Sequence, residues 1–163
     1  MTDDPVGRLA VWGALLRVHA QVVPELEREL SAVHMPLSWY DALLELNGAP
    51  GRRLRMSELG ARVVLSRERV SRVVAELERA HLVRRERNVE DGRSIFAVLT
   101  PAGRERLREA APIYLGGIER HVTSHLTDEE ARTISAALER VLAATRSESD
   151  VGVPARSEDG AHA

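Results

Sequence analysis

Apolar residues recur every three or four positions over most of this chain, which predicts a mainly helical protein. The first such stretch begins at Asp4-Pro5, where an N-cap aspartate precedes a proline suited to the first turn, and it continues into the low 30s. Pro24 lies inside this stretch. Because proline cannot donate the helical hydrogen bond, we expect it to kink or break the helix.

Three shorter elements are expected next. A second helix is predicted from Ser38, with Asp41 three residues later as part of a near capping box, to Asn47-Gly48. The segment RLR at 53–55 is a candidate short strand, and MSELGARVV at 56–64 is a candidate third helix.

The fourth predicted helix is amphipathic and begins at the N-cap Ser66. Leu65 and Val70 have the spacing of a hydrophobic staple around that cap. The residues expected to form its buried stripe are Val70, Val73, Val74 and Leu77. At about 100° per residue, the opposite side carries Glu68, Arg72, Ala75 and Arg79, flanked by Arg69, Ser71 and Glu76.

A small β-ribbon and two further helices complete the predicted order. The strands are LVRRER at 82–87 and SIFAVL at 94–99, joined by a polar tip that contains Asp-Gly. A fifth helix starts at the cap Thr100, and we expect Pro112 and Gly116-Gly117 to interrupt it. A sixth helix opens with the capping box TDEE, and the tail 147–163 lacks apolar periodicity and is expected to be disordered.

The composition narrows the classes of function. The chain has 163 residues, enough for one domain with extensions, and its lack of cysteine excludes disulfides, cysteine nucleophiles and thiolate metal sites. No apolar run reaches the roughly 20 residues that a membrane span needs, so we expect a cytoplasmic protein without a membrane partner. Residues 52–106 hold 14 arginines and 8 acidic residues, although the whole chain has a net charge of −2. A basic middle between acidic ends is typical of a surface that binds a polyanion.

Two helices followed by a β-ribbon is the order of elements in a winged helix-turn-helix. The second helix of that unit enters the major groove of DNA, which is about 12 Å wide, and its N-terminal residues meet base edges. The candidate DNA-binding residues of this helix are Ser66, Arg67, Arg69, Ser71 and Arg72. An ordinary amphipathic helix with a charged, solvated face would show the same pattern, so the helix alone does not decide.

The tip of the ribbon supplies a second candidate contact with DNA. Arg93 could enter the minor groove, where a narrow A·T tract deepens the negative potential. Asp91, two residues earlier, is placed to hold that side chain extended. The alternative is a plain Asp-Gly hairpin turn with a surface ion pair of ~0–1 kcal/mol. Helix and ribbon together favour DNA binding.

From about residue 10 to 145 the chain resembles the MarR (multiple antibiotic resistance regulator) family of transcription factors. The matching segments are LRMSELGARVVLSRERVSRVVAELERAHLVRR, EDGRSIFAVLTPAG and HLTDEEARTISAAL. The most diagnostic part is Asp-x-Arg followed by a strand that ends Leu-Thr-x-x-Gly, found as Asp91, Arg93, Leu99, Thr100 and Gly103.

The resemblance implies a homodimer of six-helix subunits. It assigns residues 5–35 and 104–146 to an intertwined helical dimerisation domain, and residues 36–103 to a winged helix-turn-helix that binds a pseudo-palindromic operator. Two departures affect the DNA-binding lobe. Glu76 stands where the family often has a phosphate-contacting arginine, and His81 stands where it favours a glycine in the left-handed conformation.

The resemblance also implies a small-molecule effector, often an anionic aromatic, bound between the dimerisation helices and the DNA-binding lobe. The candidate lining residues are Trp12, His19, Trp39, Tyr40, Tyr114 and His121. These side chains could instead simply fill a core that is poor in rings. His121 and His125 lie one helical turn apart and could bind zinc with His19, but no HExxH motif or cysteine supports this, and no metal or cofactor is assigned.

The expected function is therefore a ligand-responsive transcriptional repressor with double-stranded DNA, a second copy and an effector as partners. No phosphate-binding glycine loop or dinucleotide fingerprint appears, and the catalytic residue types are poorly placed to converge, so an enzyme is not expected. Two alternatives stay open. One is a winged-helix module that binds protein and not DNA, which Glu68 and Glu76 on the outer face would suit; the other is a metal-responsive regulator.

Overall fold

The computed structural model describes residues 5–63, 66–88 and 94–151. The chain divides into two compact units, Met1–His121 and Val122–Ala163. The elements of the first unit are α1 (Pro5–Ser31), α2 (Leu37–Gly48), the short 3₁₀ helix η1 (Pro50–Arg52), β1 (Arg53–Arg55), α3 (Met56–Arg62), α4 (Arg67–Arg79), β2 (Val83–Arg87), β3 (Ile95–Leu99) and α5 (Pro101–His121). The second unit contains η2 (Thr123–His125) and α6 (Asp128–Val151). The expected fold class, mainly helical with a winged helix-turn-helix, is confirmed.

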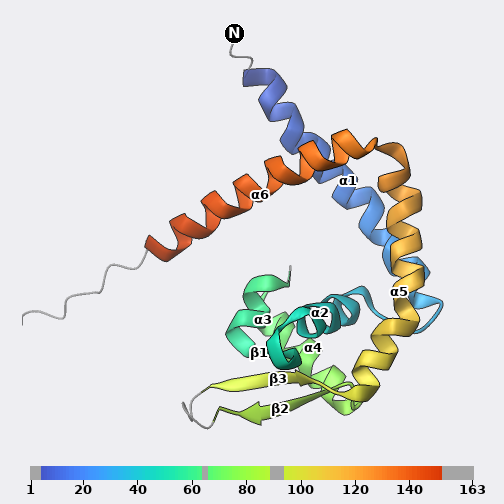
Figure 1. Ribbon diagram of the computed structural model, residues 1–163, viewed down its shortest axis with the longest axis vertical. Coiled ribbons are helices and arrows are strands. Elements are labelled where there is room, and N and C mark those ends of the chain that lie inside the picture. Colours follow the sequence, from blue (N-terminus) through green and yellow to red (C-terminus); the bar gives the residue numbers. More distant parts are fainter. Residues whose placement is uncertain (1–4, 64–65, 89–93, 152–163) are drawn as a thin grey trace, which may run out of the picture. The chain divides into compact units, whose positions relative to one another are not determined.

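The winged lobe consists of α2, α3 and α4 packed with a small antiparallel sheet (Figure 1). The predicted ribbon of β2 and β3 is present, with Val83 opposite Leu99 and Arg87 opposite Ile95. The predicted strand β1 joins it along the other edge of β3, which gives the strand order β1-β3-β2. The ribbon is therefore part of a three-stranded sheet.

Aliphatic side chains from the helices and the sheet form the core of this lobe. The fully buried leucines are Leu43 and Leu46 of α2, Leu59 of α3 and Leu77 of α4. Ala97 of β3 is also fully buried and belongs to the same core. Each fully buried leucine of this kind contributes about 1.5–3 kcal/mol, and together they fix the position of α4 on the sheet.

Proline and glycine do not divide the long helices as the sequence predicts. α1 continues through Pro24, and α5 continues through Pro112 and Gly116-Gly117, so the predicted interruption of α5 is wrong. The two helices pack against each other over part of their length. Side-chain packing between helices supplies most helical stability in proteins, and here it outweighs the one hydrogen bond that each proline removes.

Two other helix ends differ from their predicted positions. α2 begins at Leu37 after Pro36, without a side-chain cap, so the predicted capping box at Ser38 and Asp41 is not formed. α6 has its predicted capping box, in which the backbone N–H of Thr127 donates to Glu130 at 2.8 Å. α6 then continues to Val151, into the segment expected to be a disordered tail. The predicted staple residue Leu65 lies outside the described residues.

Over the part of the chain that the structure describes, no helix combines the length and the apolar character needed to cross a lipid bilayer.

Candidate nucleic-acid interface and neighbouring cavities

α4 is the helix that the sequence predicts to enter DNA, and Ser66 determines where it begins. The Ser66 hydroxyl accepts a hydrogen bond from the backbone N–H of Arg69 at 3.4 Å, as expected of an N-cap. The predicted buried stripe is confirmed, because Val70, Val73, Val74 and Leu77 are all buried. With this side of the helix in the core, the opposite side faces solvent.

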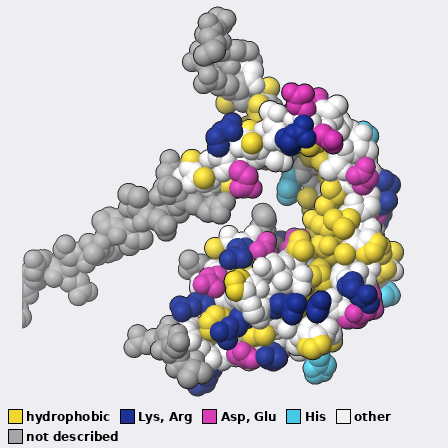
Figure 2. Space-filling view, in the orientation of Figure 1, with side chains coloured by type: hydrophobic (Ala, Val, Ile, Leu, Met, Phe, Trp, Pro, Cys, Tyr) yellow, Lys and Arg dark blue, Asp and Glu magenta, His cyan; other side chains and the backbone are white. Residues whose placement is uncertain are grey.

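Three of the predicted DNA-contacting side chains lie on the solvent side of α4. Arg69, Ser71 and Arg72 are exposed, and Arg67 is the first residue of the helix. A guanidinium group has five N–H donors in a fixed fork, which suits phosphate oxygens and guanine edges. Arginine side chains are prominent over the winged lobe in Figure 2. The exposed face of α4 can therefore bind a polyanion.

Glu76 lies on the flank of α4 where the sequence places it, but this flank is covered and not exposed. Its side chain is half-buried, and it accepts a hydrogen bond from the indole Nε1 of Trp39, on α2, at 3.0 Å. Helical periodicity identified the flank correctly, but it carries no information about which neighbouring helix covers that flank. The acid that departs from the family pattern is thus turned towards α2.

Arg85 connects β2 to the other flank of α4, and sequence reasoning missed it. Its Nη2 donates to the backbone carbonyl of Ser71 at 3.3 Å, and its Nη1 lies 3.6 Å from a carboxylate oxygen of Glu78. The signal was the alternation of the strand, since Arg85 shares a face with the buried Val83 and must point towards the helix layer.

The base of the wing is closed by a polar pair. The amide of Asn88, a buried polar residue, donates through Nδ2 to the hydroxyl of Ser94 at 3.0 Å, and its backbone N–H donates to the Ser94 carbonyl at 3.0 Å. Asp91 and Arg93, the residues predicted to reach the minor groove, lie outside the described residues.

The Leu-Thr-x-x-Gly motif, residues 99–103, connects the start of α5 to the turn after α4 through hydrogen bonds of Thr100. The Thr100 hydroxyl accepts from the backbone N–H of Gly103 at 3.0 Å and lies 2.8 Å from the carbonyl oxygen of His81. A Cβ at Gly103 would collide with the carbonyl oxygen of Leu82, so only glycine fits. His81 itself has φ 59°, the left-handed conformation expected where the family favours glycine.

A cavity of about 910 Å³ lies between α2 and the first turns of α5. Tyr40 and Tyr114 contribute two rings with centroids 4.3 Å apart and planes tilted by 36°, and burial raises the pKa of both phenols. Arg52 and Arg104 line the same cavity and bring positive charge to it. Two of the predicted effector-binding residues are therefore brought together, beside cations that the sequence did not single out.

A second cavity of about 570 Å³ lies beside the first turns of α2 and α4. Its lining includes the predicted effector residue His19, together with Tyr114, Arg69 and Asp41. Burial, with a smaller contribution from the charge of Glu45, raises the pKa of Asp41 to about 6. Residues of α2 and Arg69, which belongs to the predicted DNA-binding face, therefore line the same cavity.

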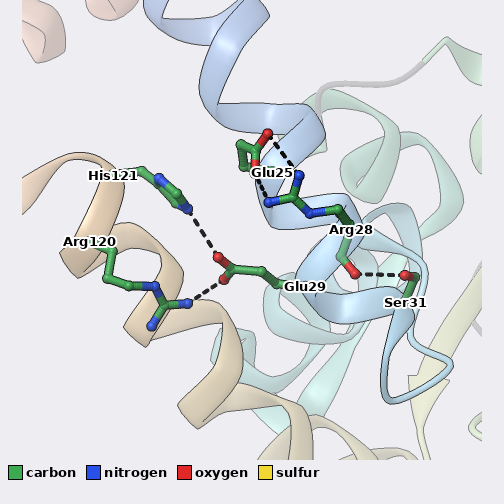
Figure 3. A network of polar contacts seen from close by, with 6 residues as sticks. All are labelled: Glu25, Arg28, Glu29, Ser31, Arg120 and His121. Carbon is green, nitrogen blue, oxygen red and sulfur yellow. Dashed lines mark hydrogen bonds and ion pairs between the residues drawn. The ribbon is translucent and has the colours of Figure 1, made fainter.

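The other predicted effector residues line neither cavity. Trp12 is 63% exposed on α1, and Trp39 is bonded to Glu76. His121 belongs to a polar network between α1 and α5, in which Glu29 accepts from Nε2 of His121 at 3.0 Å and from Nη2 of Arg120 at 2.6 Å (Figure 3). The bonds from Arg120 and His121 lower the pKa of Glu29.

Comparison with known proteins places this geometry in a family. A model of the MarR family matches residues 35–94. The HTH-type transcriptional repressor Rv2887 of Mycobacterium tuberculosis is 30% identical over 139 residues, which cover 85% of this chain and 94% of that protein.

Solved structures of MarR-family transcriptional regulators from Streptomyces coelicolor have the same fold. AbsC superposes with a TM-score of 0.78 and 31% identity, covering 90% of this chain and 99% of AbsC. Sco3205, which was solved in complex with DNA, superposes with a TM-score of 0.76 and 32% identity, covering 87% of this chain and 89% of Sco3205. This chain belongs to the MarR family of transcriptional regulators.

Proposed function

We propose that this protein is a transcriptional repressor that binds a pseudo-palindromic operator as a homodimer and releases it on binding a small molecule. The observation that carries the proposal is the architecture of α4, which is capped at Ser66, buried along one stripe and exposes Arg69, Ser71 and Arg72 along the other. A helix held in this way can lie in a major groove with its N-terminal residues at the base edges. The DNA complex of the relative Sco3205 supports this assignment.

A second copy of the chain is the partner proposed for the exposed apolar face of α1. Leu9, Trp12 and Leu16 are 72%, 63% and 50% exposed, and their spacing puts them on one side of the helix. Monomeric proteins rarely expose an apolar stripe of this kind. We propose that residues 5–35 and 104–146 supply the dimerisation domain, and that Trp12 belongs to this interface and not to an effector site.

The effector is proposed to be an aromatic carboxylate, bound against the Tyr40 and Tyr114 rings. Arg52 and Arg104, which line the same cavity, supply guanidinium groups for the carboxylate. Effector and operator would then oppose each other with a coupling of about 1–3 kcal/mol. Benzoate is a minimal probe: it should raise the melting temperature of the free protein and weaken its binding to DNA, and an Arg104→Gln variant should lose both responses.

DNA binding is tested with duplexes selected from a random-sequence library by the purified protein. If each subunit neutralises about four phosphates, a plot of the logarithm of the association constant against the logarithm of the salt concentration should have a slope of about −7. A slope close to zero, or no enrichment of any duplex, would contradict the proposal and favour a winged-helix module that binds protein. With Glu76 turned to Trp39, that alternative keeps only Glu68 of its two acidic residues on the exposed face of α4.

A further inference from the structure

Both flanks of α4 are attached to neighbouring elements by polar side chains. On one flank, Glu76 accepts the indole N–H of Trp39 from α2 at 3.0 Å. On the other, Arg85 from β2 donates to the carbonyl of Ser71 and pairs with Glu78. At about 100° per residue, positions 76 and 78 fall on opposite sides of the buried stripe. The two attachments therefore oppose rotation of the helix about its own axis in either direction.

Rotation of α4 would change what its exposed residues can reach. Its buried stripe consists of aliphatic side chains, whose packing has no directional bonds. A helix with its side chains has a radius of about 5–6 Å, so a rotation of about 10° moves the side-chain ends by roughly 1 Å. A shift of that size is enough to misalign the hydrogen bonds of Ser71 and Arg72 with base edges, because such bonds tolerate only a few tenths of an ångström.

The Trp39–Glu76 pair is chemically matched to hold this position. The indole N–H is only a donor and the carboxylate is only an acceptor, so the pair has one arrangement. Both side chains are half-buried, which reduces competition from water. The bond also turns the carboxylate of Glu76 towards α2 and away from the centre of the exposed face, which explains how an acid is tolerated on a helix that meets phosphates.

We propose that Glu76 is a positioning residue for sequence recognition, which acts through the Trp39 indole to fix the rotation of α4 on α2. The proposal rests on the proposed function, because it assumes that α4 reads DNA. Glu76 touches no base; it determines which bases Ser71 and Arg72 reach. The property that it controls is the ratio of affinities for the selected duplex and for a scrambled duplex of the same composition.

The test compares this ratio, at one salt concentration, in three single variants of the full chain and in the double variant that combines Trp39→Phe with Glu76→Ala. Trp39→Phe removes the N–H and keeps a ring, Glu76→Ala removes the acceptor, and Glu76→Gln keeps an acceptor oxygen without the charge. Trp39→Phe and Glu76→Ala should each lower the ratio by about five- to tenfold, and the double variant should lose no more than the worse single one. Glu76→Gln should stay within about twofold of the unchanged protein.

Each other result overturns the proposal. If Glu76→Gln and Glu76→Ala both strengthen binding to the two duplexes equally while Trp39→Phe changes nothing, the carboxylate acts only as a charge near phosphate. The matched control for this effect of charge is Glu68→Gln, because Glu68 is an exposed acid on the same helix. If the variants lower the melting temperature and leave the ratio unchanged, the bond is merely structural. A wild-type protein that binds no duplex would refute the proposed function itself, whereas normal wild-type binding with unchanged variant ratios refutes only the role of Glu76.

Discussion

Asp41 is a carboxylic acid in a partly buried position beside a cavity, and its environment opposes ionisation. Burial is the main cause and repulsion from the charge of Glu45 the smaller one, and together they raise the pKa of Asp41 to about 6. The folded protein therefore holds a proton on Asp41 more tightly than the unfolded chain between about pH 4 and 6. Protonated Asp41 therefore favours the folded state at the acidic end of that window, and this contribution to the free energy of unfolding is lost as the pH rises through 6.

Replacing Asp41 with asparagine should consequently stabilise the protein at neutral pH. The variant avoids the cost of a charge in a partly buried site, which we expect to be about 1–2 kcal/mol after allowing for the solvent that still reaches the group. Urea unfolding at pH 7.5 and 4.5 measures the difference, which should be large at the first pH and small at the second. Glu139→Gln, an exposed acid on α6, should show neither effect. A wild-type protein whose stability rises between pH 5 and 7 relative to Asp41→Asn would contradict the assignment.

Arg93 follows Asn88 and precedes Ser94 in the chain, and these two residues close the base of the wing. If its side chain enters the minor groove, Arg93→Ala should weaken binding to the selected duplex by several-fold or more, because one charged contact in a narrow groove is lost. Fluorescence anisotropy measures the affinity, and light scattering should find the dimer intact. Asp91→Asn should have a smaller effect in the same direction, since it removes only the group expected to hold Arg93 extended. An unchanged affinity in Arg93→Ala would exclude the groove contact.

At the scale of elements, the contact between α1 and α5 depends on a glycine that helix propensity disfavours. A Cβ at Gly117 would lie 2.5 Å from Cδ2 of Leu26 and 2.6 Å from a carboxylate oxygen of Glu29. Leu26 is buried, and Glu29 is held by Arg120 and His121, so neither neighbour can easily move away. The missing side chain is what lets the two helices approach here.

Two adjacent glycines provide a matched pair of variants for this contact. Gly117→Ala should destabilise the protein by about 1–2 kcal/mol, because the overpacking exceeds the gain in helix propensity. Gly116→Ala meets only the flexible end of Arg120, at 3.2 Å, and should stabilise by up to about 1 kcal/mol. Urea denaturation of the two variants gives both values. Changes of the same sign would mean that the approach of α1 to α5 does not require Gly117.

Sequence could specify local features of the fold and not long-range ones. The cap at Ser66 and the stripe from Val70 to Leu77 were predicted because both depend on residues within one helix. The interruption predicted in α5 was wrong, and Pro24 does not end α1, because packing between distant helices decides whether a proline or glycine ends a helix. The bond between Trp39 and Glu76 joins residues 37 positions apart, and no periodicity within α4 could reveal it.

The site was predictable to a similar extent. Recognition-helix residues follow from the order of elements, whereas cavities follow from packing. Tyr40 and Tyr114 were singled out by position, and the structure places their rings together; that they bind an effector stays a prediction. Arg52 and Arg104 were missed because arginine is abundant and nothing local separates a cavity-lining one from a solvated one. Trp12 and His121 were assigned to the effector by position alone, and neither lines a described cavity.

For the whole molecule, charge and apolar surface are distributed to suit different partners. The basic segment 52–106, with 14 arginines against 8 acidic residues, forms much of the winged lobe, while the exposed apolar residues of α1 precede it in the chain. Like charges on two winged lobes repel each other, so a dimer that presents both to DNA needs an apolar contact elsewhere. We propose that the exposed apolar side of α1 is the surface for that contact.

Disrupting this surface should separate dimerisation from folding. Leu16→Glu puts a charge on the exposed apolar side of α1 without touching the core, so the winged lobe should stay folded while the dimer dissociates. Light scattering should show a change from twice the 18.0 kDa chain mass to a single chain. Affinity for a two-half-site duplex should then fall far more than affinity for one half-site, because the second lobe no longer binds as part of the same molecule. Gln21→Glu, an exposed polar position on the same helix, introduces the same charge and should leave both measurements unchanged. A Leu16→Glu protein that keeps its dimeric mass would show that α1 does not carry the subunit contact.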